Sequence, residues 1–156
     1  MTQKSIITNP ETVQALQELH KVKEGLLRPI DVVEAARSET SPLHKHFEWD
    51  DTAAAEKFRI EQARGLLQRV FVRVQTPDGK ERMTQVFVSL STDRFSDGGG
   101  YRQLVDVLSD SDMRNQLVRD ALADMQMFES RYKEIQELAS VYREMKRARK
   151  ILSKTA

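Results

Sequence analysis

The sequence predicts an α+β protein that is mostly helical, with N-terminal helices, one β-hairpin and a long C-terminal helix. Three successive patterns of hydrophobic spacing support this prediction. Apolar residues recur at helical spacing up to about residue 70, alternate at strand spacing between 70 and 90, and follow a seven-residue spacing after 110. With 156 residues, the chain suits one domain, or a small domain with a helical extension.

Two helices are expected before residue 40. The first begins after Asn9, a good N-cap residue that is followed by Pro10, and it runs to about Val22. The second runs from about Pro29 to Arg37. A polar loop follows, because the cluster at 38–42 ends in a proline that a helix interior does not accommodate.

A third helix is expected to begin near Asp51 or Thr52, where side chains can cap the first turn and acids suit the helix dipole. Helical spacing predicts one packed face and one exposed face. The packed face contains Ala53, Ile60, Ala63, Leu67 and Val70, widened by Phe58 and Leu66. The exposed face contains Lys57, Glu61, Arg64 and Gln68. In the loop before this helix, Phe47 and Trp49 are expected to anchor the chain to the core.

A hairpin is expected after the third helix. Alternating apolar residues lie on both sides of a type I turn formed by Thr76-Pro77-Asp78-Gly79. The two expected strands carry Val70, Val72 and Val74, and then Val86, Val88 and Leu90. Two strands alone are marginally stable, so the hairpin must pack on the helices or on another chain.

The predicted domains are a helical unit with the hairpin at 1–91, a glycine-rich linker at 92–100 and a helical extension at 101–156. The extension begins with a short helix at Tyr101–Leu108 and continues as one helix from about Asp110 to Ile151. Its heptad spacing predicts a coiled-coil-like seam, which needs a partner folded back from its own chain or supplied by a second copy. The expected oligomer interface consists of Met125, Phe128, Tyr132, Ile135 and Tyr142.

Composition removes several classes of function. There is no cysteine, which excludes disulfides, thiol catalysis and cysteine-based zinc sites. No apolar run approaches a membrane span and the N-terminus lacks a signal-peptide core, so we expect a soluble cytoplasmic protein with no membrane partner.

No catalytic residue, metal site or cofactor is expected. His44 and His46 lie near acids and could bind a metal, but no third histidine is held at a fixed spacing, and loop or capping roles explain these groups more simply. The glycines at 98–100 are not followed by the lysine and hydroxyl residue of a phosphate-binding loop. The chain is therefore predicted not to be an enzyme.

The leading functional hypothesis is binding of double-stranded DNA. Three helices followed by a hairpin are compatible with a winged helix, in which the third helix enters the major groove. The predicted nucleic-acid residues are Lys57, Arg59 and Arg64 on this helix, Lys80 and Arg82 on the hairpin, and Lys146, Arg147, Arg149 and Lys150 near the C-terminus. Against this hypothesis, acids precede the third helix, and a basic last turn also complements a helix dipole.

The alternative is a homo-oligomeric protein that binds another protein without touching DNA. Charge is segregated along the chain: residues 101–142 carry five Lys/Arg against eight Asp/Glu, and residues 143–156 carry six against one. Such segregation favours contacts through local patches.

One pattern gives a resemblance. Its parts are Ser41-Pro42-Leu43-His44, Phe47-Glu48-Trp49-Asp50-Asp51, Ala54-Ala55-Glu56, Arg59 and Gln62-Ala63-Arg64. The pattern resembles uncharacterised small proteins of tailed phages and prophages, and the resemblance continues to about residue 142. It implies a phage or prophage origin and action in the bacterial cytoplasm, and it carries over no functional residue.

Overall fold

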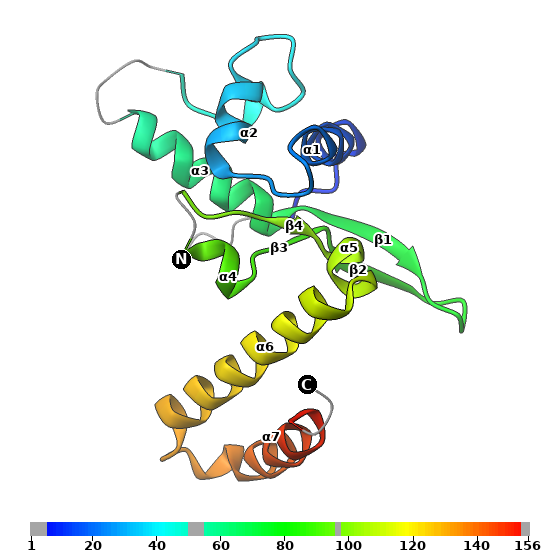
Figure 1. The fold of residues 1–156 in the computed structure, drawn as a ribbon, viewed down its shortest axis with the longest axis vertical. Coiled ribbons are helices and arrows are strands. Elements are labelled where there is room, and N and C mark those ends of the chain that lie inside the picture. The colour runs from blue at the N-terminus through cyan, green and yellow to red at the C-terminus, as the bar shows by residue number, and fades with distance from the viewer. Residues whose placement is uncertain (1–5, 50–54, 96–97, 154–156) are drawn as a thin grey trace. The chain divides into compact units, whose positions relative to one another are not determined.

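The computed structural model describes residues 6–49, 55–95 and 98–153. The α+β, mostly helical class predicted from the sequence is confirmed. The chain forms two compact units, Met1–Asp106 and Val107–Ala156, called here the N-terminal and C-terminal units. Figure 1 shows the helices and strands of both units.

The first two helices follow the predicted bounds closely. Helix α1 spans Pro10–Val22, and the Asn9 side chain accepts the Thr12 amide hydrogen at 3.0 Å. It ends where Gly25 adopts a positive φ of 83°, a conformation that glycine tolerates without strain. Helix α2 spans Pro29–Ala36, and Asp31 accepts the Arg28 amide hydrogen at 3.0 Å.

Helix α3 spans Ala55–Arg69 among the described residues, so the predicted start at Asp51 or Thr52 lies outside them. Its packed face contains Arg59, Ala63 and Leu66, all buried. Phe58 was predicted to widen this face, and that prediction is wrong: its side chain is 56% exposed. Helical spacing places Phe58 on the opposite side from Ala63.

The predicted hairpin is formed by β1 (Phe71–Gln75) and β2 (Glu81–Gln85), paired antiparallel with Val74 opposite Arg82. The turn is closed by hydrogen bonds from the Gly79 amide to the Thr76 carbonyl and from the Thr76 amide to the Lys80 carbonyl, both at 2.8 Å. The hairpin is shorter than predicted, because Val88 leaves it for a second sheet.

The second sheet was not predicted. It pairs β3 (Phe87–Val88) with β4 (Arg102–Gln103), and Leu27 and Tyr101 exchange two backbone hydrogen bonds beside it. The short helix predicted from Tyr101 therefore begins later, as α5 (Leu104–Ser109). Residues 101–106 belong to the N-terminal unit, so the division of the chain follows Asp106 and does not fall at 92–100. A short helix, α4 (Ser91–Arg94), occupies part of the predicted linker.

One apolar core holds the N-terminal unit together. Leu16 of α1, Val33 of α2, Leu66 of α3 and Phe87 of β3 are fully buried in it. The loop at 41–49 contains a 3₁₀ helix, η1 (His44–His46), and covers one side of this core. Phe47 is buried in the core and Trp49 packs against it, so the predicted anchoring role of these aromatics is confirmed.

The C-terminal unit corrects the prediction of one continuous helix at 110–151. Helix α6 (Ser111–Tyr132) ends before a 3₁₀ turn, η2 (Gln136–Leu138), and α7 (Ala139–Leu152) follows. Glu129 of α6 pairs with both Lys146 and Arg149 of α7, so α7 folds back along α6 (Figure 1). The coiled-coil-like seam predicted for α6 therefore packs in part against α7 of the same chain. None of the helices in the described ranges combines the length and apolarity needed to cross a bilayer.

Candidate functional site

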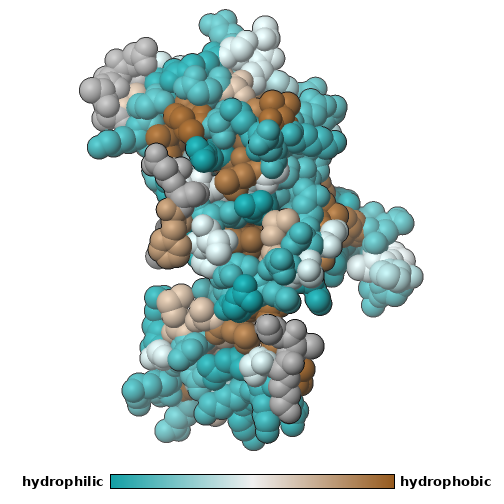
Figure 2. All heavy atoms as spheres, in the orientation of Figure 1, coloured by the Kyte–Doolittle hydropathy of each residue, from teal (hydrophilic) through white to brown (hydrophobic). Residues whose placement is uncertain are grey.

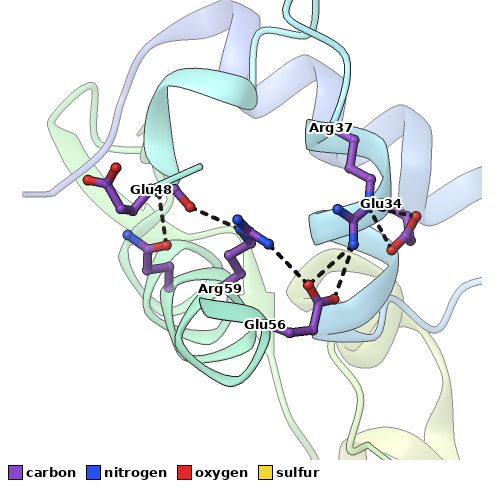
Figure 3. Close-up of polar contacts among 6 residues, drawn as sticks. Glu34, Arg37, Glu48, Glu56 and Arg59 are labelled. Carbon is purple, nitrogen blue, oxygen red and sulfur yellow. Dashed lines mark hydrogen bonds and ion pairs between the residues drawn. The ribbon is translucent and has the colours of Figure 1, made fainter. Parts of the chain in front are cut away.

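The cations predicted on α3 do not form one surface. Arg59, the central one, is only 3% exposed and points into the N-terminal unit. Its Nε donates to the Glu48 carbonyl at 3.0 Å, and its Nη1 lies 3.3 Å from a Glu56 carboxylate oxygen (Figure 3). Its guanidinium also lies 5.0 Å from the centre of the Trp49 ring. The prediction that Arg59 binds nucleic acid is therefore wrong, because the side chain ties the loop at 41–49 to α3.

Arg59 belongs to a small charged network. Glu56 also accepts from Arg37, the C-cap residue of α2, whose guanidinium contacts Glu34 at 3.1 Å (Figure 3). The two carboxylates raise the pKa of Arg37, chiefly through the hydrogen bond to Glu34. This network joins α2, α3 and the loop, and it explains the local arginines structurally.

The other predicted cations of the N-terminal unit are dispersed over its surface. Lys57 is exposed on α3, and Arg64 lies 3.6 Å from Glu61. On the β-hairpin, Lys80 pairs with Asp78 at 3.4 Å and Arg82 is exposed. Acids accompany two of these four cations, so the positive field that they present together is weak.

The histidines of the 41–49 loop serve the fold. His44 stacks on Trp49 with ring centres 4.8 Å apart and its Nδ1 lies 2.9 Å from the Ala36 carbonyl. His46 places its Nε2 3.1 Å from the Thr12 hydroxyl, and burial lowers its pKa. Within the part of the chain that the structure describes, no three metal-ligating side chains come together. Asp50 and Asp51 lie outside it.

The predicted C-terminal cations come together on α7. Lys146 and Arg149 both pair with Glu129, Arg147 lies 3.2 Å from Glu144, and Lys150 is exposed. Arg143, which was not singled out from the sequence, is exposed on the same helix. Five cations against one acid make α7 the most basic element of the described chain.

A groove of about 480 Å³ runs between α6 and α7. It is lined by Arg119, Leu122, Ala123, Gln126, Arg149, Lys150 and Ser153, and is called here the α6–α7 groove. Arg119 was not predicted, because it lies 27 residues before Lys146, the first residue of the predicted basic cluster, in an acidic stretch. Only the fold-back of α7 brings it to Arg149 and Lys150.

Some of the predicted interface residues contact one another within the helical hairpin formed by α6 and α7. Phe128 is 5.1 Å from Tyr132 and 6.3 Å from Tyr142 between ring centres, and these three residues are called here the aromatic cluster. The Tyr142 hydroxyl donates to the Tyr132 carbonyl at 2.6 Å. Desolvation, followed by the Glu129 charge, raises the pKa of Tyr142. Met125 is half-buried, whereas Phe128, Tyr132 and Ile135 remain exposed.

The apolar face of the helical hairpin is incompletely covered. No residue of α6, η2 or α7 is buried. Phe128 is 39% exposed and Tyr132 is 38% exposed. Figure 2 shows apolar (brown) surface among hydrophilic (teal) surface in this unit. A pair of helices with this surface can bind another polypeptide.

In comparisons with known proteins, no family model, no curated protein and no solved structure matches the chain.

Proposed function

We propose that the protein is a non-enzymatic interaction protein that assembles with itself through the α6–α7 helical hairpin. The observation that carries this proposal is the absence of a core in that hairpin: α6, η2 and α7 bury no residue, while the aromatic cluster and Ile135 stay accessible. Two helices without a core are marginally stable in water, because tertiary packing supplies most helical stability. A partner surface that covers this face would supply the missing burial.

A second copy is the partner that we propose for this face. The hairpin carries both an acidic helix and a basic helix, since α6 has four acids against three cations and α7 has five cations against one acid. An isologous contact brings the same patch from two subunits together. A patch that contains both signs can therefore meet itself with opposite charges in register.

The test is the mass of the protein in solution, measured by light scattering over a range of concentrations. We expect a species larger than the monomer, and we expect Phe128→Ala with Tyr132→Ala to shift it toward the monomer. Met127→Ala is the matched control, because Met127 is 60% exposed next to Phe128 and lies on another side of the helix. Circular dichroism must show that the variants keep their helices. A monomeric wild type at high micromolar concentration would contradict the proposal.

Binding of DNA is a second candidate, and the basic surface of α7 favours it. Arg143, Lys146, Arg147 and Lys150 are exposed on one helix, and Lys57 and Arg82 add exposed cations in the N-terminal unit. Arg59 no longer supports this function, since it is committed to the loop at 41–49. The winged-helix mode therefore loses its central residue, and the support moves to the C-terminal unit.

Salt dependence tests the DNA candidate directly. Phosphate contacts release counterions, so the affinity should fall linearly with salt on a log–log scale. An affinity for duplex DNA that is absent at low salt, or that does not change with salt, would remove this candidate and leave the self-association proposal intact.

The origin that we propose rests on the motif at 41–64. Its residues Phe47, Trp49 and Arg59 form the anchor of the loop, so the motif describes a structural unit of the N-terminal domain. A phage or prophage origin would place the protein in the bacterial cytoplasm, with a host or phage protein as a further partner. Affinity capture from a bacterial lysate, with and without nuclease, separates protein partners from those bridged by DNA.

A further inference from the structure

We infer that the α6–α7 groove is a binding site for a phosphate group of a nucleic-acid backbone. The inference rests on the second candidate function, DNA binding, and locates this binding in the α6–α7 groove. Arg119 of α6 and Arg149 and Lys150 of α7 line the groove, and its lining includes no acid. Cations from two helices thus converge on one concave surface.

The charge balance around the groove favours an anion. Arg149 is 24% exposed and is paired with Glu129, which also contacts Lys146 at 3.7 Å. One carboxylate therefore serves two cations and leaves a positive excess, to which Arg119 and Lys150 add. Asp120 does not line the groove, and its carboxylate accepts from the Gln116 amide at 2.9 Å.

Arg119 is oriented without losing its charge. Its Nε and Nη2 both donate to the Gln116 side-chain oxygen, at 3.2 and 2.7 Å. Gln116 is neutral, so this contact fixes the guanidinium but does not neutralise it. Two of the five N–H donors of the guanidinium serve Gln116, and the three that remain on Nη1 and Nη2 can face the oxygens of a phosphate. Arg119 is therefore preorganised for an anion.

The rest of the lining suits a phosphodiester better than a bare ion. Leu122 and Ala123 add apolar groups to the lining, against which a sugar can pack, and Gln126 and Ser153 add polar groups. A volume of about 480 Å³ accommodates a nucleotide unit but not a folded domain. The C-terminal end of α7 carries the negative end of the helix dipole, which disfavours an anion. The Ser153 amide donates to the Arg149 carbonyl and reduces this effect.

The experiment measures binding of fluorescently labelled duplex DNA to the full chain by anisotropy at low salt. Arg119→Gln and Lys150→Gln should each lower affinity by about three- to tenfold, and each should reduce the salt slope by about one. Arg114→Gln is the matched control: it removes the same charge from the same helix as Arg119, outside the groove, and should change affinity by less than about twofold. Equal losses in groove and control variants would overturn the inference.

Two competitors identify the ligand. Pyrophosphate tests for a free phosphate compound, and polyglutamate tests for any polyanion. Weak competition by both supports a nucleic-acid backbone, whereas competition as strong as that of unlabelled DNA by either one overturns this assignment. Light scattering separates the two proposals. If Arg119→Gln assembles like the wild type but has lost DNA binding, the result supports the groove. If the wild type itself is a monomer, the result contradicts only the self-association proposal. No binding of DNA by the wild type would overturn the groove inference together with the DNA candidate, and would leave the self-association proposal intact.

Discussion

At the scale of single residues, a charged side chain at helical spacing says little about whether it is exposed. Arg59 has the same charge as Arg64 and lies on the same helix, yet it is buried under Trp49 while the Arg64 side chain is 43% exposed. Arg59→Ala removes the ring contact and leaves the Glu48 carbonyl without this donor, so it should lower the free energy of unfolding by about 2–4 kcal/mol.

Arg64→Ala is the control, and as a surface change it should stay within about 0.5 kcal/mol. Urea unfolding followed by Trp49 fluorescence, from the single tryptophan of the chain, measures both variants. Equal effects of the two substitutions would show that Arg59 does not anchor the loop.

A second prediction at the scale of residues concerns the loss of stability at acidic pH. His20 is buried at the end of α1, and its Nε2 accepts the Gln103 amide hydrogen at 3.3 Å, which requires an unprotonated nitrogen. Burial lowers the pKa of His20 from 6.5, against smaller opposing effects of a backbone hydrogen bond with Gly25 and of the Asp106 charge. As the pH falls, the unfolded chain therefore takes up the proton first, and the free energy of unfolding drops below about pH 6.5 until the folded-state pKa is passed.

Replacing His20 by Gln should remove part of this pH dependence. His46, whose pKa burial also lowers, should supply the remainder. Urea midpoints measured between neutral pH and pH 5 give the comparison. A variant whose midpoint falls with pH as steeply as that of the wild type would rule out His20 as a contributor.

At the scale of secondary-structure elements, the sequence predicted the features that neighbouring residues determine, namely helix caps and tight turns. Asn9 with Pro10 defined the start of α1, and the Thr76–Gly79 turn defined the hairpin, because caps and turns depend on a few neighbouring residues. The break at 133–138 was missed, since it contains neither proline nor glycine and the heptad spacing runs through it. Contacts far along the chain, such as Glu129 with Arg149, accompany that break and have no local signal.

The same limit applies to the candidate site. Lys150 and Arg149 were predicted from their sequence cluster, but Arg119 joins them only through the fold-back of α7. The strand at Arg102–Gln103 was missed for a similar reason, because its partner Phe87–Val88 lies beyond a loop. Two residues are too few to give a periodic pattern.

Gly100 offers a test of an element boundary. The sequence suggested a linker, yet Gly100 is buried, and a Cβ there would collide with the side chain of Leu26. Gly100→Ala should therefore lower the free energy of unfolding by about 1–3 kcal/mol, the usual cost of overpacking. Urea unfolding measures this cost.

Gly98→Ala provides the comparison, because nothing lies near its added Cβ but its φ is 81°. Backbone strain alone should cost about 1–2 kcal/mol there. If Gly100→Ala proved harmless, the segment would behave as the linker that the sequence suggested.

At the scale of the whole molecule, the two units differ in what stabilises them. The N-terminal unit has a core that includes Leu16, Val33, Leu66 and Phe87, whereas α6, η2 and α7 bury no residue. We expect two thermal transitions, since a unit with its own core and a helical hairpin without one need not unfold together. The transition of the C-terminal helices should rise with protein concentration, because assembly stabilises only the folded helices.

Far-UV circular dichroism follows the helices of both units, and Trp49 fluorescence follows the N-terminal unit alone, over a concentration range of about a hundredfold. The two signals should separate, and mass action over that range should stabilise the assembled helices by about 2.7 kcal/mol per bound partner while the fluorescence transition stays fixed. Phe128→Ala should lower the midpoint temperature of the transition of the C-terminal helices and leave that of the Trp49 fluorescence transition unchanged. Coincident transitions that ignore concentration would mean that the C-terminal helices take their stability from within a single chain, and the self-association proposal would then fail with them.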